Sequence, residues 1–244
     1  MAGPGLEVCF SPSLLSTTGH KPGRNVVVVD ILRATTAMCT AFGFGAASLA
    51  PVAGEEEAFE KKQQGWLVAG ETDGIKLPFA DFGNSPLEFR DPSIRGKDIV
   101  FCTTNGTLAI QLGKEYGKVL IASFVNLQAV SGWLKRDDKD VLILCAGWKN
   151  EFALEDAIFA GAMADLLVTA YGFLPECDAT IASMTLWHQS ASNLMKTVSM
   201  SSHFLRLLEI EGRKGLEYCF YPEKFSVIPV LGEEGITDIA IKNL

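Results

Sequence analysis

The stretch N-V-V-V-V-D-I-L-R-A-T-T, residues 25–36, decides the fold. Four consecutive valines lead into Asp30, and Arg33, Thr35 and Thr36 follow. An unbroken β-branched run is typical of a strand that is buried on both faces of a parallel sheet. Open α/β sheets bind ligands at the carboxyl ends of their strands. The stretch therefore predicts a ligand site or, with equal weight, a strand whose closing aspartate caps the next helix.

The chain repeats this alternation of an apolar strand and a helix. Strands rich in Val, Ile and Leu are predicted over residues 6–10, 25–31, 48–52, 66–70, 98–102, 118–123 and 140–147. Helices are predicted over about 35–44, 54–65, 108–116, 126–136 and 154–171. The pattern predicts an α/β fold with a largely parallel sheet and helices on both faces.

The last third of the chain has a weaker pattern. Residues 175–215 look helical, V-I-P-V at 227–230 is a candidate strand, and 236–242 fits a strand or a short helix. Residues 72–86 are the longest stretch without periodicity, and long loops in compact domains are often functional. Because no charged or low-complexity linker interrupts the chain, we expect one α/β domain over residues 1–244, with a candidate sub-domain division near 172.

The composition limits the possible partners and the compartment. The formal charge is 21 − 29, or −8, and the pI is near 5.0, which argues against nonspecific binding to nucleic acid or anionic membranes. An anionic substrate therefore needs a local pocket of cations, backbone N–H groups or a metal. Six cysteines without a C-x-x-C pair, no secretory signal and no apolar run of ~18 residues predict a cytoplasmic protein with reduced thiols and no membrane span.

Polar side chains follow several predicted strands at the point where each strand ends. The carboxyl ends of parallel strands meet at one edge of the sheet, so residues far apart in sequence converge there. The clusters are Asp30 with Arg33, Thr35 and Thr36; Glu71; Asp81 with Asn84 and Ser85; Thr103–Thr107; and the segment from Cys145 to Asp156. This convergence predicts a functional site that no single cluster would establish.

Five carboxylates belong to these clusters, and they predict a metal site. They are Asp30, Glu71, Asp81, Glu155 and Asp156. Acids gathered at one sheet edge repel one another unless a cation neutralises them, and oxygen ligands without histidine or cysteine at zinc spacing suit Mg²⁺. The alternative is that each acid caps a helix or is solvated.

The segment T-T-N-G-T predicts half of a phosphate cradle. A hydroxyl-rich turn that enters a helix presents backbone N–H groups to an oxyanion, and we expect Thr104, Asn105, Gly106 and Thr107 to do so beside Arg33. Taken alone, such a turn is more often a helix cap. The chain contains no Walker A sequence.

The segment C-A-G-W-K-N, residues 145–150, adds a thiol and a cation. Cys145 is a candidate nucleophile if a nearby cation lowers its pKa, although a buried cysteine is more often a small hydrophobe. Lys149 is expected to pair with a substrate anion or to be solvated. His188 and His203 stand at no diagnostic spacing and are expected to be structural, with entry into the pocket from the last part of the chain as the alternative for either.

Taken together, these motifs resemble one family, the magnesium-dependent 2-phosphosulfolactate phosphatases. The matching segments are V-D-I-L-R-A-T-T (29–36), A-G-E-T-D-G-I-K (69–76), D-F-G-N-S-P-L-E-F (81–89), T-T-N-G-T-L-A-I (103–110), and C-A-G with L-E-D (145–147 and 154–156). The resemblance implies a three-layer α/β/α fold, Mg²⁺ dependence, and hydrolysis of 2-phospho-3-sulfolactate to 3-sulfolactate and phosphate. In some organisms that step lies on the route to coenzyme M.

The residue chemistry agrees with this resemblance. Arg33 can fork onto phosphate or sulfonate oxygens, and carboxylate-held Mg²⁺ would offset phosphoryl charge and orient water. Asp30 is favoured as a ligand or general base over a phosphoryl acceptor, because acceptor phosphatases commonly carry D-x-D and residue 32 is leucine. The alternatives are a phosphatase of another small 2-phospho-hydroxyacid and a noncatalytic anion-binding protein of the same fold. A homodimer is the default expectation for the assembly.

Overall fold

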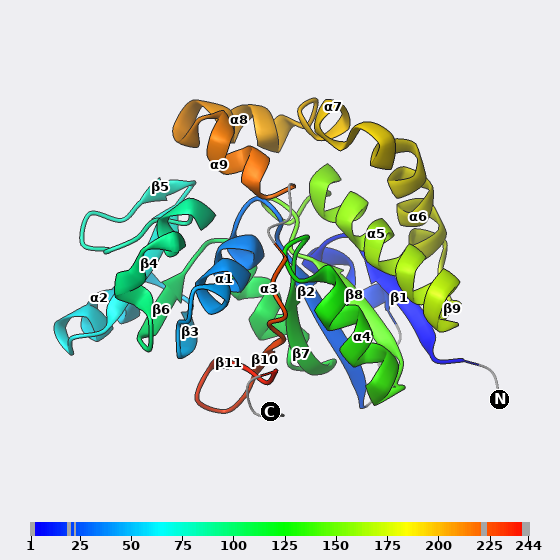
Figure 1. Cartoon of the computed structure of the whole chain (residues 1–244), viewed down its shortest axis with the longest axis horizontal. Coiled ribbons are helices and arrows are strands. Elements are labelled where there is room, and N and C mark those ends of the chain that lie inside the picture. The colour runs from blue at the N-terminus through cyan, green and yellow to red at the C-terminus, as the bar shows by residue number, and fades with distance from the viewer. Residues whose placement is uncertain (1–2, 19–20, 22, 221–223, 241–244) are drawn as a thin grey trace.

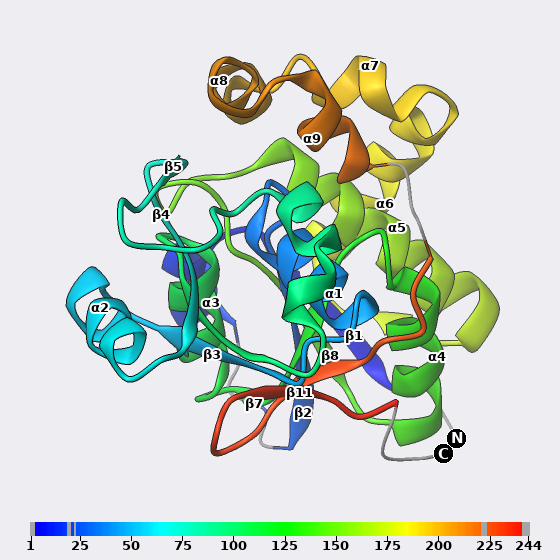
Figure 2. The same cartoon turned by 60° about the vertical axis from the view of Figure 1, so that its left-hand side comes forward.

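The computed structural model describes residues 3–18, 21, 23–220 and 224–240 (Figure 1). The described residues form an eleven-stranded sheet in the order β5-β4-β6-β3-β11-β10-β7-β2-β8-β1-β9. Helices cover both faces of this sheet (Figures 1 and 2). The predicted α/β class, the largely parallel sheet and the three-layer arrangement are confirmed.

The elements follow the predicted order closely. The strands are β1 Gly5–Cys9, β2 Arg24–Val29, β3 Ser48–Val52, β4 Leu67–Thr72, β5 Ile75–Lys76, β6 Asp98–Cys102, β7 Gly117–Ala122, β8 Val141–Cys145, β9 Leu174–Pro175, β10 Pro229–Leu231 and β11 Ile236–Asp238. The helices are α1 Ala34–Gly43, α2 Glu55–Gln63, α3 Gly106–Gly113, α4 Leu127–Asp137, α5 Leu154–Tyr171, α6 Asp178–Ser190, α7 Leu194–Val198, α8 Ser202–Glu211 and α9 Arg213–Tyr218. Short 3₁₀ turns lie at Pro12–Thr17, Pro86–Arg90, Pro92–Ile94 and Ala191–Asn193.

Strand β2 lies between β7 and β8 and is parallel to both. Its valines alternate between two cores: Val27 and Val29 pack with residues of α4 and α5, and Val26 and Val28 pack with residues of α1 and α3. All four valines have no exposed surface. The apolar run is therefore continuous because both faces of the strand are covered by helices.

The segment 72–86 contains a structure that the periodicity did not indicate. Strands β4 and β5 form an antiparallel hairpin, with Glu71 opposite Lys76 and Thr72 opposite Ile75. Its two-residue turn is Asp73–Gly74, and both residues have positive φ, 52° and 84°. Asp-Gly is a strong sequence signal for such a turn, and it places the turn directly beyond the end of β4.

A C-terminal hairpin joins the two parallel parts of the sheet. Strands β10 and β11 pair with each other in antiparallel fashion, and Val230 pairs with Leu120 of β7 while Ile236 pairs with Leu49 of β3. The candidate strand at 227–230 and the strand alternative for 236–242 are thus confirmed, with residues 241 and 242 outside the described residues. The hairpin inserts between β7 and β3, so the chain after residue 172 completes the central sheet.

Helices α6 to α9 arch from one end of the sheet across the carboxyl ends of its strands (Figures 1 and 2). The side chains of Phe204 and Leu207 anchor α8 in the same core that contains Val27 and Val29. Consequently, α8 lies over the edge at which the sequence predicts the site. Every helix among the described residues is too short or too polar to cross a lipid bilayer.

We predict that Asp238→Ala lowers the free energy of unfolding by about 2–4 kcal/mol, because it leaves two backbone donors near the hairpin without an acceptor. Asp238 Oδ1 accepts hydrogen bonds from the backbone N–H groups of Ile228 (2.7 Å) and Ala240 (2.9 Å). Asp238→Asn retains this oxygen and should cost less. Urea unfolding of the three proteins measures the difference, and equal stability of the alanine variant and the wild type would contradict the role given to the hairpin.

Candidate active site

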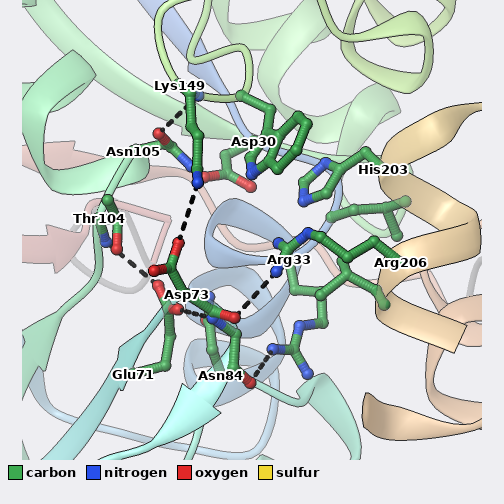
Figure 3. A pocket seen from close by; sticks show the side chains of 14 residues that line it. Asp30, Arg33, Glu71, Asp73, Asn84, Thr104, Asn105, Lys149, His203 and Arg206 are labelled. Atoms are coloured by element: carbon green, nitrogen blue, oxygen red, sulfur yellow. Dashed lines mark hydrogen bonds and ion pairs between the residues drawn. The ribbon is translucent and has the colours of Figure 1, made fainter. Parts of the chain in front are cut away.

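A narrow cavity lies at the carboxyl edge of the sheet, between the strand ends and α8 (Figure 3). Its walls come from the ends of β2, β4, β6 and β8 and from one face of α8. The lining residues are Asp30, Leu32, Arg33, Glu71, Asp73, Gly74, Asn84, Thr104, Asn105, Trp148, Lys149, His203, Arg206 and Leu207. The strand-end clusters therefore converge in space.

Asp30 follows the last residue of β2 and has two functions at once. Its Oδ1 accepts the backbone N–H of Ala34 at 3.1 Å, in the first turn of α1, and the side chain also lines the cavity. The two interpretations of this aspartate, helix cap and site residue, are thus compatible. Burial raises the pKa of Asp30 to about 6, and the nearby carboxylates of Glu71 and Glu155 contribute to the increase.

Glu71, near the end of β4, is hydrogen-bonded to two loops beside Asp30. Its Oε1 accepts the backbone N–H of Thr104 at 3.1 Å, and its Oε2 accepts that of Gly74 at 2.5 Å. The end of β4 is thereby fixed to the hairpin turn and to the loop after β6. Glu71 is buried and lies on the cavity wall (Figure 3).

Arg33 is the buried cation of the site. Its Nη2 donates to the carbonyl oxygen of Gly74 at 3.0 Å, and its Nη1 forms an ion pair with Glu211 at the end of α8. The hydroxyl of Ser85 also hydrogen-bonds Glu211, so Ser85 supports the ion pair from outside the cavity lining. Asn84 does line the cavity, and its buried Oδ1 has no hydrogen-bond partner within the described residues.

Three threonine hydroxyls that follow strand ends donate hydrogen bonds to backbone carbonyl oxygens. Those of Thr35 and Thr36 donate to the carbonyl oxygens of Asp30 (2.9 Å) and Ile31 (3.0 Å), and both side chains are fully buried. The hydroxyl of Thr107 donates to the carbonyl of Thr103 at 2.5 Å. These three predicted anion-binding residues thus hold the loops in place and do not line the cavity.

The loop after β6 reaches the cavity with Thr104 and Asn105. Gly106 follows at the start of α3, where an added Cβ would lie only 2.6 Å from the Cβ of Ala34. The glycine therefore permits α3 to begin directly beside α1 and Asp30. The Oδ1 of Asn105 accepts the backbone N–H of Lys149 at 3.3 Å, which connects this loop to the loop after β8.

Lys149 lies at the solvent side of the cavity. Its Nζ is 3.6 Å from Asp73 Oδ1 and 5.3 Å from the centre of the Trp148 ring. Arg206 of α8 places its guanidinium carbon 5.0 Å from the centre of the same ring and donates to the carbonyl of Asp73 at 2.9 Å. Two cations thus flank the indole of Trp148 at the cavity mouth.

His203 enters the cavity from the first turn of α8. Its Nδ1 lies 2.7 Å from Glu155 Oε1, and its ring stacks on Trp148 with a 5.5 Å centroid separation and a 15° interplanar angle. The sequence left two alternatives for His203, a structural role or entry into the pocket from the last part of the chain, and the structure places it in the cavity lining. The available signal was that His203, Arg206 and Leu207 share one face of a predicted helix, at i, i+3 and i+4.

A family model described as 2-phosphosulpholactate phosphatase matches residues 9–234, a range that includes every residue of the cavity lining. The chain belongs to this family. A probable 2-phosphosulfolactate phosphatase of Thermotoga petrophila is 37% identical over 209 residues, covering 85% of this chain and 89% of that protein. Proteins with the same name from Caldanaerobacter subterraneus subsp. tengcongensis (34% over 212 residues; 85% and 88%) and Gloeothece citriformis (36% over 217 residues; 86% and 90%) are similar along comparable lengths.

The five carboxylates that the sequence predicts as metal ligands lie in three separate places. Asp30 and Glu71 line the cavity, whereas Glu155 and Asp156 are buried behind the lining in the first turn of α5. Asp81 lies apart, 2.5 Å from Lys62 Nζ and 2.9 Å from the backbone N–H of Val68. The five predicted ligands therefore do not form a single cluster.

Asp156 holds two strand exits together. Its Oδ1 accepts the N–H of Ile31 (2.8 Å) after β2, and its Oδ2 accepts that of Gly147 (3.1 Å) after β8. Burial raises the pKa of Asp156 well above its usual value, and the neighbouring Glu155 and Asp30 add to this effect. Since both oxygens accept backbone hydrogen bonds and the side chain does not line the cavity, Asp156 has a structural role.

Cys145 is the last residue of β8 and is fully buried in the hydrophobic core. Burial raises the pKa of its thiol well above the usual value, with Asp156 contributing to the shift. The reactive thiolate is thus disfavoured, and the side chain does not line the cavity. The structure gives Cys145 the environment of a packed hydrophobe.

Within the described part of the chain, no three His, Cys, Asp or Glu side chains form a group that could hold a metal ion by themselves. Mg²⁺ often binds through only one or two carboxylates, with water and substrate phosphate completing its shell. Asp30 and Glu71 line one cavity wall and meet this smaller requirement, because each Glu71 oxygen accepts only one backbone N–H and has a second lone pair for a cation. The donor set thus fits a magnesium ion that is shared with a phosphoester.

We predict that Asp30→Asn stabilises the metal-free protein at pH 8. A carboxyl pKa of about 6 instead of 3.8 means that the charged form costs about 3 kcal/mol of stability, at about 1.4 kcal/mol per pKa unit. This cost is complete above about pH 6 and disappears as the group protonates toward pH 4. The free energy of unfolding of the asparagine variant should therefore exceed that of the wild type by about 1–3 kcal/mol at pH 8, and the difference should disappear at pH 4. Urea unfolding in the presence of EDTA measures both values.

Asp81→Asn is the matched control with the opposite sign. Partial burial of Asp81 tends to raise its pKa, but hydrogen bonds from Lys62 and Val68 outweigh burial and lower it. This carboxylate stabilises the fold at neutral pH, and its contribution is lost as the pH falls through the lowered pKa. Asp81→Asn should therefore destabilise the protein at pH 8, and the same direction of change for both variants would contradict the assignment.

Proposed function

We propose that the protein is a Mg²⁺-dependent phosphatase that hydrolyses 2-phospho-3-sulfolactate to 3-sulfolactate and phosphate. The family, and the names of its relatives, support phosphoric monoester hydrolysis. The observation that carries the proposal is that one cavity places a buried guanidinium, Arg33, beside two strand-end carboxylates, Asp30 and Glu71. The guanidinium is suited to bind phosphate oxygens, and the two carboxylates are suited to bind a divalent cation.

The cavity compensates locally for the acidity of the whole chain. Arg33, Lys149 and Arg206 supply positive charge, and α1 and α3 both begin beside Asp30 with their positive dipole ends. A substrate with phosphate, sulfonate and carboxylate groups would engage several of these donors together. The cations are spread from the buried Arg33 to the mouth, which matches a small molecule with charge at more than one end.

Arg33 is paired with Glu211, and this pairing suggests how the site binds phosphate. Its partner Glu211 would be exchanged for phosphoryl oxygens, to which the planar guanidinium can donate two parallel hydrogen bonds. Asn84 lies next to Arg33 on the wall and has a further polar group to offer (Figure 3). Both residues are buried, so the substrate contacts would be shielded from water.

We assign Mg²⁺ to Asp30 and Glu71, where it would offset charge on the phosphoryl oxygens. Asp30 orients the attacking water and receives its proton, which accords with direct hydrolysis. Asp156 and Cys145 hold the strand ends in position and take no part in the chemistry. The role of this step on the route to coenzyme M, the cytoplasmic location and the homodimer stay predictions from the sequence.

We predict Mg²⁺-dependent phosphate release from 2-phospho-3-sulfolactate by the purified protein, abolished by EDTA and restored by added Mg²⁺. Asp30→Asn should reduce kcat at least about 100-fold, because it removes a carboxylate from the water and metal site. Arg33→Lys should also reduce kcat/KM, since an ammonium cannot fork onto phosphate. Asp81→Asn, outside the cavity, should retain wild-type activity and serves as the control.

The same assay separates the alternatives. Faster hydrolysis of another 2-phospho-hydroxyacid would reassign the substrate and retain the reaction class. No metal-dependent release from any phosphoester in the panel would contradict the enzyme and favour a noncatalytic anion-binding protein. Activity of Asp30→Asn within about tenfold of the wild type, or about 1.4 kcal/mol of barrier, would remove Asp30 from the centre of the mechanism.

A further inference from the structure

His203 and Glu155 form a buried pair on the side of the cavity opposite Glu71. The side chains of His203 and Glu155 are 9% and 1% exposed, and Nδ1 lies 2.7 Å from Oε1. A carboxylate can only accept a hydrogen bond, so Nδ1 carries a proton and donates it to Glu155. The other ring nitrogen, Nε2, is then the one available to the cavity that His203 lines.

The imidazole is held in a fixed orientation. Trp148 stacks against one face of the ring with an interplanar angle of 15°. Ser201 caps α8, its hydroxyl oxygen accepting the backbone N–H of Phe204 at 3.1 Å, so the turn that carries His203 is also fixed. A carboxylate that orients a histidine whose second nitrogen faces a reaction cavity is the arrangement by which proteins position a proton-transfer group.

Hydrolysis of an alkyl phosphate needs such a group. When the bond between phosphorus and the ester oxygen breaks, the leaving group is a strongly basic alkoxide, and protonation during bond cleavage lowers the barrier. Arg33 and Arg206 also line the cavity, and a guanidinium is suited to binding anions and not to proton transfer. Lys149 is more than half exposed and lies near Asp73 at the mouth.

We infer that His203 is the general acid that protonates the leaving oxygen, with Glu155 as its positioning residue; this rests on the proposed phosphatase function. The oxygen of water forms a bond to phosphorus, and the ester P–O bond breaks with its electron pair going to the alkyl oxygen. That oxygen takes the proton from Nε2 of the imidazolium form of His203, which leaves a neutral ring whose Nδ1–H still donates to Glu155. The proton released by the attacking water passes to Asp30 and returns through solvent to His203, so the cycle balances as water plus ester giving alcohol plus phosphate.

The test compares leaving groups. 4-Nitrophenyl phosphate releases a weakly basic phenolate that needs no proton, whereas 2-phospho-3-sulfolactate releases an alkoxide. His203→Gln should lower kcat for the alkyl ester about 100- to 10,000-fold and for the aryl ester less than about tenfold. Glu155→Gln should show the same selectivity with a smaller loss, because the ring stays in the cavity but loses its carboxylate partner.

The chain contains a matched control pair. His188 of α6 lies 2.8 Å from Asp165 of α5, but its side chain is 58% exposed and it does not line the cavity. His188→Gln should leave both reactions unchanged. A second measurement needs no variant: the wild-type kcat for a series of phosphate esters should depend only weakly on the leaving-group pKa, and this dependence should steepen in His203→Gln.

Equal losses on the alkyl and aryl esters in His203→Gln would overturn the inference, since they indicate a role in packing or binding alone. A steep leaving-group dependence in the wild type would overturn it as well, even if His203→Gln does not fold. Failure of the wild type to hydrolyse either ester with Mg²⁺ would contradict the phosphatase proposal, and the general-acid role with it. Hydrolysis by the wild type with no selective loss in the variant would contradict the role of His203 alone.

Discussion

The concentration of negative charge at the carboxyl edge of the sheet constrains the rest of the structure. Four carboxylates lie within this region in a largely buried setting, and two of them have both oxygens hydrogen-bonded by the protein itself. Asp156 and Glu71 each accept two backbone N–H groups, whereas Glu155 pairs with His203 through Oε1 and its buried Oε2 has no hydrogen-bond partner among the described residues. Of the two carboxylates that line the cavity, Asp30 is the less compensated, because among the described residues its side chain has one hydrogen bond, from the N–H of Ala34.

This difference is the reason that we propose a cation and a phosphate as the occupants of the site. The raised pKa of Asp30 reflects a charge that is poorly compensated in the protein alone. A magnesium ion beside Asp30 would provide the missing compensation, and a phosphoester would in turn satisfy Arg33 in place of Glu211. The same cavity thus contains Asp30, whose negative charge is poorly compensated, and Arg33, which we propose exchanges Glu211 for phosphate.

Helix α8 turns the open sheet edge into an enclosed site. It contributes His203, Arg206 and Leu207 to the lining and Glu211 to the ion pair with Arg33. These contacts bring the last third of the chain onto loops that follow β2, β4 and β8. In the proposed exchange, phosphate would replace Glu211 at Arg33 and thereby remove one of the attachments of α8.

The sequence predicted the sheet and its converging strand ends because their signals are local. A valine run ending in Asp30 is sufficient to indicate a doubly buried strand, and parallel strands place their carboxyl ends together. The Asp73–Gly74 hairpin was not predicted, because β5 is only two residues long and shows no periodicity. The Asp-Gly dipeptide was the one local signal of its turn.

Local sequence signals could not predict contacts between residues that are far apart in the chain. His203 is more than 170 positions from Asp30, and only the path of α6 to α9 across the sheet brings it into the cavity. Likewise, sequence could place Asp81 after a strand but could not show that Lys62 pairs with it outside the cavity. The sequence also could not show whether the hydroxyls of Thr35 and Thr36 bind a ligand or the backbone. In the folded loop both donate to backbone carbonyl oxygens.

The most direct test of this account is a crystal structure of the protein soaked with Mg²⁺ and inorganic phosphate. The account predicts a magnesium ion in contact with the carboxylates of Asp30 and Glu71, and a phosphate whose oxygens accept hydrogen bonds from Arg33. It also predicts that Arg33 has released Glu211. A metal ion bound at Asp81 or on the protein surface, or a phosphate bound away from Arg33 with the Arg33–Glu211 pair intact, would contradict it.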